Sequence, residues 1–176
     1  MTRSQRGRND GPRLEESLEG LVRRIAGSLP RSRLPVHLYL DVSGSVEPLL
    51  GLLCEAARGV AHLVCPEVHL FSTDLVDARV GEPATAACQT TGGTSIAPVA
   101  RHIRQRRVLR AVVVTDGEVG PIGARDRETL GETILGVALT GGRESGGELA
   151  GLARHVVVLA GRKRRARAGG RRKRDT

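Results

Sequence analysis

Aromatic residues are almost absent from this 176-residue chain, which has one Tyr, one Phe and no Trp. A buried core must therefore consist of Leu, Val, Ile and Ala packed between layers, a composition typical of helices against a sheet. The length fits one domain of ordinary size. Such a domain can bury enough apolar surface to fold without disulfides or a structural metal.

Cysteine is also scarce. The three cysteines, Cys54, Cys65 and Cys88, are odd in number and show no C-x-x-C spacing. This pattern indicates neither a disulfide framework nor a zinc site. We expect small, half-buried thiols in a reducing compartment.

Long apolar runs are missing as well. No segment approaches the roughly 18 uncharged apolar residues of a membrane helix. The N-terminal stretch MTRSQRGRNDGPR is basic but has no apolar region of the kind found in signal peptides. We therefore expect a cytoplasmic protein that does not enter a membrane.

The basic residues that give the chain its formal net charge of +9 belong mostly to its two ends. Residues 1–13 hold four Arg and one Asp, and residues 162–176 hold nine Lys or Arg and one Asp, so the stretch between them is close to neutral. We interpret 1–13 as a disordered basic arm, 14–161 as one folded domain and 162–176 as a disordered basic tail. The tail could bind nucleic acid through phosphates, but a solvated terminus explains it equally well, and it lacks interleaved aromatics for base stacking.

Hydrophobic periodicity predicts helices and strands that alternate along the chain. Apolar residues recur on one helical face over residues 14–29 and 95–106, which predicts two amphipathic helices. Residues 46–64 are apolar on most faces and predict a long buried helix, whereas residues 120–132 are interpreted as a connection. The expected strands are 36–42, 66–73, 75–80, 108–115, 133–140 and 155–160.

This alternation predicts an α/β fold, with a doubly wound, mostly parallel central sheet and helices on both faces. Residues 66–73 and 75–80 are separated by a very short turn, so we expect one short antiparallel strand at an edge. Ligands of such sheets bind outside the carboxyl ends of the strands, near the point where the strand order reverses.

Three polar segments are predicted to lie at such strand ends or at a helix start. They read DVSGS at 41–45, TTGGTS at 90–95 and TDGE at 115–118. Their side chains offer carboxylate and hydroxyl oxygens without any His or Cys, and their glycines allow close approach of the backbone. Oxygen-only sites select Mg²⁺ or Mn²⁺.

In this order the three segments resemble the metal-ion-dependent adhesion site of von Willebrand factor type A domains, a Rossmann-like fold. In that family the first motif reads D-x-S-x-S, the second supplies a threonine from a Gly-rich loop, and the third supplies an aspartate after a strand. The matching residues in this sequence are Asp41, Ser43, Ser45, Thr94 and Asp116. The resemblance covers residues 35–161 and includes the late segment ILGVALTGG.

The resemblance implies that Ser43, Ser45 and Thr94 reach a Mg²⁺ ion directly, with Mn²⁺ as a substitute, and that Asp41 and Asp116 act directly or through water. A Glu or Asp of a protein partner would complete the coordination. Similarity to small intracellular prokaryotic members implies an adaptor or regulator, associated with an AAA+ ATPase or a metallopeptidase-like protein, and no catalysis. The alternative is a component of a ribonucleoprotein or DNA-associated complex that binds nucleic acid through its basic tail.

Each of these polar residues also has a simpler explanation. Asp41, Ser43 and Ser45 taken alone fit the N-cap of the following helix, and Thr94 fits a cap of the next one. Only the ordered set favours a metal site. Glu118 is explained by a solvated turn as well as by contact with the site.

Known enzyme motifs fit less well. A haloacid-dehalogenase-like phosphatase needs D-x-D and a lysine, but Ser43 stands at the third position and the only lysines, Lys163 and Lys173, lie in the tail. The G-x-S-x-G elbow of serine hydrolases and the P-loop are both missing. The histidines pair with no obvious carboxylate or nucleophile and are interpreted as structural or surface residues; they are His37, His62, His69, His102 and His155.

Overall fold

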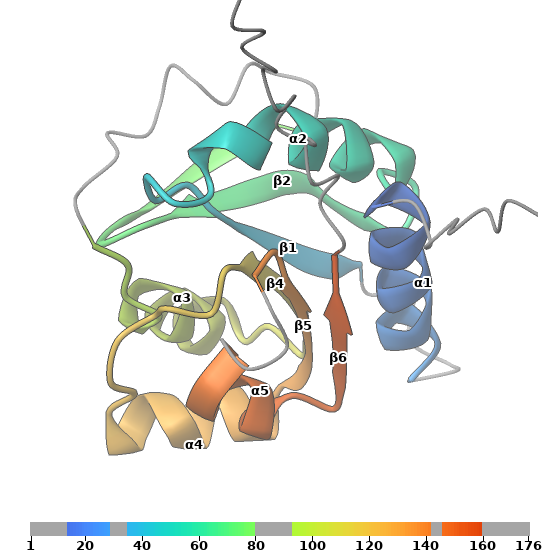
Figure 1. Cartoon of the computed structure of the whole chain (residues 1–176). Coiled ribbons are helices and arrows are strands. Elements are labelled where there is room, and N and C mark those ends of the chain that lie inside the picture. Colours follow the sequence, from blue (N-terminus) through green and yellow to red (C-terminus); the bar gives the residue numbers. More distant parts are fainter. Residues whose placement is uncertain (1–13, 29–34, 80–92, 142–145, 160–176) are drawn as a thin grey trace, which may run out of the picture.

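The computed structural model describes residues 14–28, 35–79, 93–141 and 146–159, and these form one sheet covered by helices (Figure 1). The sheet has six strands in the order β3-β2-β1-β4-β5-β6. The strands are β1 (Val36–Asp41), β2 (Val64–Phe71), β3 (Leu75–Arg79), β4 (Arg110–Thr115), β5 (Ile134–Leu139) and β6 (His155–Val158).

Neighbouring strands pair in parallel, except that β3 runs antiparallel to β2 at one edge. Every residue of β4 and of β5 is buried, as expected for β-branched and aliphatic runs that are covered on both faces. The predicted α/β fold, with its mostly parallel sheet and one antiparallel edge strand, is confirmed.

The helices divide between the two faces of the sheet. The helices α1 (Leu14–Gly27) and α2 (Leu50–Gly59) lie on one face, with the short 3₁₀ helix η1 (Glu47–Leu49) leading into α2, and α3 (Ala97–Arg106), α4 (Ala124–Glu132) and α5 (Gly147–Leu152) lie on the other (Figure 1). Two separate apolar cores result, and side chains of successive strand residues alternate between them. Leu38 and Leu40 belong to the first core, and Tyr39 belongs to the second.

The predicted long helix over 46–64 is wrong in its extent. The chain forms η1 and α2, ends the helix at Gly59, and begins β2 at Val64. Gly59 is a weak helix former, and the N–H of Val36 in β1 donates to the carbonyl of Leu63 at 3.3 Å, so pairing with the sheet begins directly after the turn. Tertiary strand pairing therefore overrides the helical pattern of the last residues.

The interpretation of 120–132 as a connection is also wrong, because α4 occupies residues 124–132. Leu130 is its only buried residue. A helix that buries a single side chain leaves almost no apolar periodicity in the sequence, so the pattern could not reveal it.

Several expectations concern parts of the chain outside the described residues. These include the disordered state predicted for 1–13 and 162–176 and the loop predicted over 81–93, of which only the last residue is described. Within the described ranges, no helix has the length and hydropathy needed to cross a bilayer.

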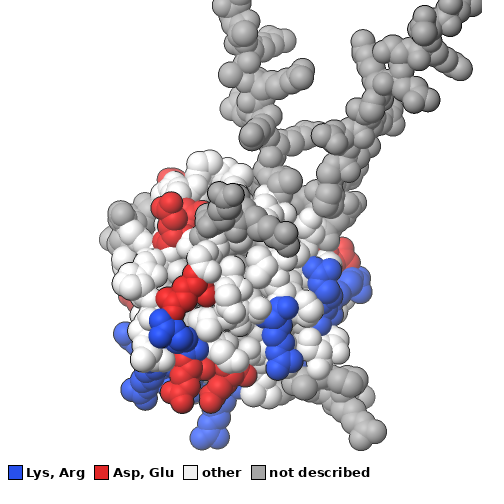
Figure 2. All heavy atoms as spheres, turned by 60° about the horizontal axis from the view of Figure 1, so that its bottom comes forward, with Lys and Arg blue, Asp and Glu red and all other residues white. Residues whose placement is uncertain are grey.

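Acidic and basic side chains are interspersed on the face that carries α4 and α5 (Figure 2). Between these two helices, the exposed side chains of Arg127 in α4 and Glu148 in α5 form an ion pair. Exposed ion pairs of this kind contribute little to stability. A face of mixed sign also gives nucleic acid no basic surface, so the nucleic-acid alternative depends on the tail rather than on this face.

Candidate functional site

The carboxyl ends of β1 and β4 lie side by side at one edge of the sheet, since the two strands are parallel neighbours. Asp41 is the last residue of β1, and Asp116 follows the last residue of β4. The chain leaves β1 through α2 on one face of the sheet and reaches β4 through α3 on the other. The two aspartates therefore lie at the point where the strand order reverses, where ligands of doubly wound sheets bind.

Asp41 is completely buried and its carboxylate is held by two neighbours. One oxygen, Oδ1, accepts the backbone N–H of Ser43 at 2.9 Å, and Oδ2 accepts the hydroxyl of Thr115 at 2.7 Å. The same Thr115 oxygen accepts the N–H of Gly117 at 3.1 Å. Gly117 has φ of 98°, a left-handed conformation that favours glycine, so the turn after β4 depends on it.

The two serines of the first segment connect it to the second aspartate. The hydroxyl oxygens of Ser43 and Ser45 lie 3.2 Å apart, and the Ser45 hydroxyl donates to Oδ2 of Asp116. The other oxygen of Asp116 accepts the N–H of Glu118 at 2.9 Å. Four of the five predicted site residues are thus joined in one continuous set of hydrogen bonds.

Thr94, the fifth predicted residue, lies at the same edge of the sheet. The neighbouring N–H of Ser95 donates to the carbonyl of Ser72, just beyond β2, at 2.8 Å. The carbonyl of Thr94 lies 3.6 Å from the place where a Cβ on Gly120 would stand, in the loop after β4. The hydroxyl of Thr94 makes no hydrogen bond to the other four predicted residues, so the structure places its backbone beside the loops after β2 and β4 without joining its side chain to theirs.

Helix capping does not account for the predicted hydroxyls. Neither η1 nor α2 has a side-chain hydrogen bond at its N-cap; instead the backbone carbonyl of Ser43 accepts the N–H groups of Val46 and Glu47 at 2.9 and 3.0 Å. At α3 it is Ser95, not Thr94, whose hydroxyl accepts the N–H of Ala97, at 3.3 Å. The simpler N-cap explanation is therefore wrong for Ser43, Ser45 and Thr94.

The electrostatics at this edge favour a cation. Burial raises the pKa of Asp41 above its usual value, the hydrogen bonds from Thr115 and Ser43 oppose that shift, and the nearby charge of Asp116 adds to it. Among the ion pairs of the described residues, none involves Asp41 or Asp116. A positive charge placed between these carboxylates would stabilise their ionised forms.

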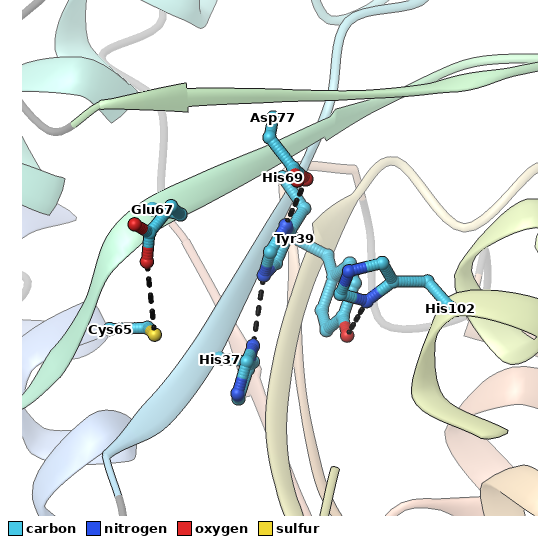
Figure 3. Close-up of polar contacts among 7 residues, drawn as sticks. All are labelled: His37, Tyr39, Cys65, Glu67, His69, Asp77 and His102. Atoms are coloured by element: carbon cyan, nitrogen blue, oxygen red, sulfur yellow. Dashed lines mark hydrogen bonds and ion pairs between the residues drawn. The ribbon is translucent and has the colours of Figure 1, made fainter. Parts of the chain in front are cut away.

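A second polar cluster lies on the same face of β1 as Asp41, toward the amino end of the strand, and the expectation that no histidine pairs with a carboxylate is wrong for His69. Nδ1 of His69 contacts Oδ1 of Asp77 at 2.7 Å, and Nε2 of His69 contacts Nδ1 of His37 at 2.9 Å (Figure 3). The hydroxyl of Tyr39 contacts Nδ1 of His102 at 2.9 Å. We call His37, Tyr39, His69, Asp77 and His102 the histidine cluster.

Strand register explains why the sequence did not reveal the histidine cluster. His37 and Tyr39 are two residues apart and therefore share one face of β1. In the sheet register, Tyr39 lies opposite His69 of β2, and His69 lies opposite Asp77 of β3. The only local signal is the two-residue spacing of His37 and Tyr39. Recognising the rest needs the register of three strands and the position of α3, which carries His102.

The histidine cluster holds neutral imidazoles. Burial lowers the pKa of His37, His69 and His102, to about 4 for His102, and the charge of Arg106 acts in the same direction on the first and the last. Burial acts to raise the pKa of Asp77, but the hydrogen bond with His69 and the surrounding charges hold it below its usual value. At neutral pH the cluster therefore contains an ionised carboxylate beside uncharged rings.

The described cysteines are half-buried, as predicted, and Cys88 lies outside the described residues. Burial raises the pKa of the Cys54 and Cys65 thiols. Cys65 donates to Oε2 of Glu67 at 3.4 Å, beside the histidine cluster (Figure 3). A protonated thiol is a poor nucleophile, so neither residue has the character of a catalytic cysteine.

No protein-family model matches the chain, and no curated protein or solved structure matches it either.

Proposed function

We propose that the chain is a von Willebrand factor type A domain that binds Mg²⁺ through its adhesion-site residues, listed as Asp41, Ser43, Ser45, Thr94 and Asp116. The observation that carries this proposal is the set of hydrogen bonds joining four of these residues at the reversal of strand order. Their donors are hydroxyl and carboxylate oxygens, which suit Mg²⁺ and Mn²⁺. Two carboxylates that form no ion pair with any described basic side chain give the cation its electrostatic reason to bind.

Each residue would have a defined part in this site. Ser43 and Ser45 would turn hydroxyl lone pairs toward the ion, and each can still donate its hydrogen to a carboxylate. Asp116 would balance the positive charge from one side. Asp41, which is held by hydrogen bonds from Thr115 and Ser43, would balance the charge of the ion from the buried side of the site and hold the loop in place. A bound ion with mainly neutral ligands remains attractive to a further carboxylate.

The exposed side of the site is where a partner would bind. Gly44, Ser45 and Glu118 are exposed, whereas Asp41 and Ser43 are buried. A Glu or Asp side chain of a protein partner can approach from this side and complete the coordination. We propose a cytoplasmic adaptor or regulator without catalytic activity, whose partner is an AAA+ ATPase or a metallopeptidase-like protein.

Capture of such a partner should depend on both the ion and the hydroxyls. We expect a protein retained by the full-length chain in Mg²⁺ to be lost in EDTA, and to be lost in Ser43→Ala and Thr94→Ala even with Mg²⁺ present. Ser28→Ala is the control, because its hydroxyl donates to the carbonyl of Arg24 at the end of α1 and is not one of the predicted site residues. Mass spectrometry of the retained proteins provides the measurement.

Retention that is equal in Mg²⁺ and EDTA would contradict the proposal. Retention that is equal in wild type, Ser43→Ala and Thr94→Ala would do so as well, because a carboxylate that completes the coordination needs the ion to be held.

A further inference from the structure

Two histidines and one aspartate of the histidine cluster come together from three separate elements. His69 belongs to β2, Asp77 to β3 and His102 to α3. One nitrogen or oxygen atom of each lies within 4.8 Å of the corresponding atoms of the other two. The ring centroids of His69 and His102 are 4.3 Å apart. These are distances at which one ion could contact all three side chains after small rotations.

The hydrogen bonds around these rings indicate which nitrogen of each histidine would face the ion. Nδ1 of His102 is engaged by the hydroxyl of Tyr39, so Nε2 is its remaining ring nitrogen. Nε2 of His69 is engaged by His37, and Nδ1 of His69 faces Asp77 (Figure 3). Histidines that bind metals typically use one ring nitrogen for the ion and donate the other N–H to a neighbouring acceptor, which fixes the ring. Tyr39 and His37 are positioned to be those acceptors.

We propose that His69, Asp77 and His102 bind one divalent transition-metal ion such as Zn²⁺, through two ring nitrogens and one carboxylate oxygen. Imidazole nitrogen with a single carboxylate suits Zn²⁺ and its first-row neighbours, whereas Mg²⁺ prefers oxygen alone. The ligand chemistry therefore separates this site from the hydroxyl and carboxylate residues at the other end of β1. With the ion on Nδ1 of His69, that ring would carry its proton on Nε2 and donate it to Nδ1 of His37, whose own proton would then be on its Nε2.

The geometry requires only side-chain adjustment. Ligands about 2.0 Å from a tetrahedral Zn²⁺ stand about 3.3 Å from one another. His69 and Asp77 are closer than this, at 2.7 Å, because a hydrogen bond joins them, and they would separate slightly around the ion. The Asp77 side chain is 44 % exposed while that of His69 is 3 % exposed, so the site opens to solvent on the β3 side. Water or an exogenous ligand can take the fourth position there.

A metal at this place would join the edge of the sheet to a helix. Among the described strands, the edge strand β3 has only β2 as a neighbour, and α3 lies over the inner strands. Ligands from β2, β3 and α3 would be tied through a single ion. Such an ion stabilises the folded chain, because the unfolded chain does not hold the three ligands together.

Metal titration of the full-length protein tests this proposal. Mg²⁺ is kept in excess so that the oxygen-rich site does not take up the added ion. We expect Co²⁺ to give the visible absorption of a low-coordinate nitrogen and oxygen site, Zn²⁺ to displace it at one equivalent, and Zn²⁺ to raise the melting temperature. His102→Ala should weaken Zn²⁺ binding at least 10-fold, and Asp77→Asn should do the same while keeping the size of a half-exposed side chain.

The matched control is His62→Ala, since His62 is an exposed histidine in the turn before β2 and is outside the cluster. It should bind Zn²⁺ as the wild type does. The proposal is overturned if the wild type binds no Zn²⁺, or if Asp77→Asn and His62→Ala bind it equally well. In either case the histidine cluster would be a hydrogen-bonded packing element only.

Discussion

Replacing both Asp41 and Asp116 with alanine is expected to abolish Mg²⁺ binding, with a loss of affinity of more than about 100-fold. The two carboxylates supply all the negative charge of the proposed site, and their removal leaves only hydroxyls to hold a divalent ion. Isothermal titration with Mg²⁺ and with Mn²⁺ measures the effect. A control that removes two acidic side chains from α4, Asp126→Ala with Glu128→Ala, should bind both ions like the wild type.

The same variant should lose the stabilisation that the ion gives. A ligand present at about 100 times its Kd stabilises the folded state by about 2.7 kcal/mol, so Mg²⁺ should raise the melting temperature of the wild type but not that of the double variant. Asp41→Asn provides a further comparison, because it retains an oxygen that can accept the Ser43 N–H at almost unchanged size. Undiminished binding in the double variant would contradict the assignment of these residues.

Leu21→Ala should lower the free energy of unfolding by about 2–5 kcal/mol. Leu21 is completely buried, and its Cδ1 would lie 3.1 Å from a Cβ on Gly136 in β5, so it packs directly on the sheet. Gly136 lets α1 approach this closely, and the smaller alanine would leave a cavity there. A domain of this size has a total stability of only about 5–15 kcal/mol, so the change is a substantial fraction of it.

Urea unfolding followed by circular dichroism measures this difference. Leu52→Ala makes the same chemical change in α2 at a side chain that is 53 % exposed, and it should alter the free energy of unfolding by less than about 0.5 kcal/mol. Equal effects of the two substitutions would mean that α1 does not pack on the sheet as described.

The fold was largely predictable because its strands are strongly patterned. The run from 110 to 115 is apolar apart from its ends and is buried throughout, and the close spacing of 66–73 and 75–80 predicts the antiparallel edge. The missed helix α4 buries only Leu130, so periodicity had almost nothing to detect. The end of α2 was misplaced because residues 60–64, which are apolar apart from His62, fit a helical pattern as well as the turn and strand that they form.

The two polar sites differ in how far sequence reasoning reaches. Asp41, Ser43 and Ser45 are neighbours in the chain, and Asp116 directly follows a recognisable strand, so topology alone predicts that they meet. The proposed ligands His69, Asp77 and His102 meet only through the register of β2 on β3 and the placement of α3, neither of which short-range patterns specify. The side-chain orientation of Thr94 could not be predicted for the same reason, because its loop is positioned by a contact with Ser72, which is distant in the sequence.

The most direct measurement of the proposed function is a ¹⁵N–¹H correlation spectrum of the full-length protein during titration with Mg²⁺. We expect the amide resonances of Ser43, Ser45, Thr94 and Asp116 to shift in a saturable manner, while that of His69 stays in place. Absence of any saturable shift at the four residues, or shifts confined to β3 and α3, would contradict a Mg²⁺ site at the carboxyl ends of β1 and β4.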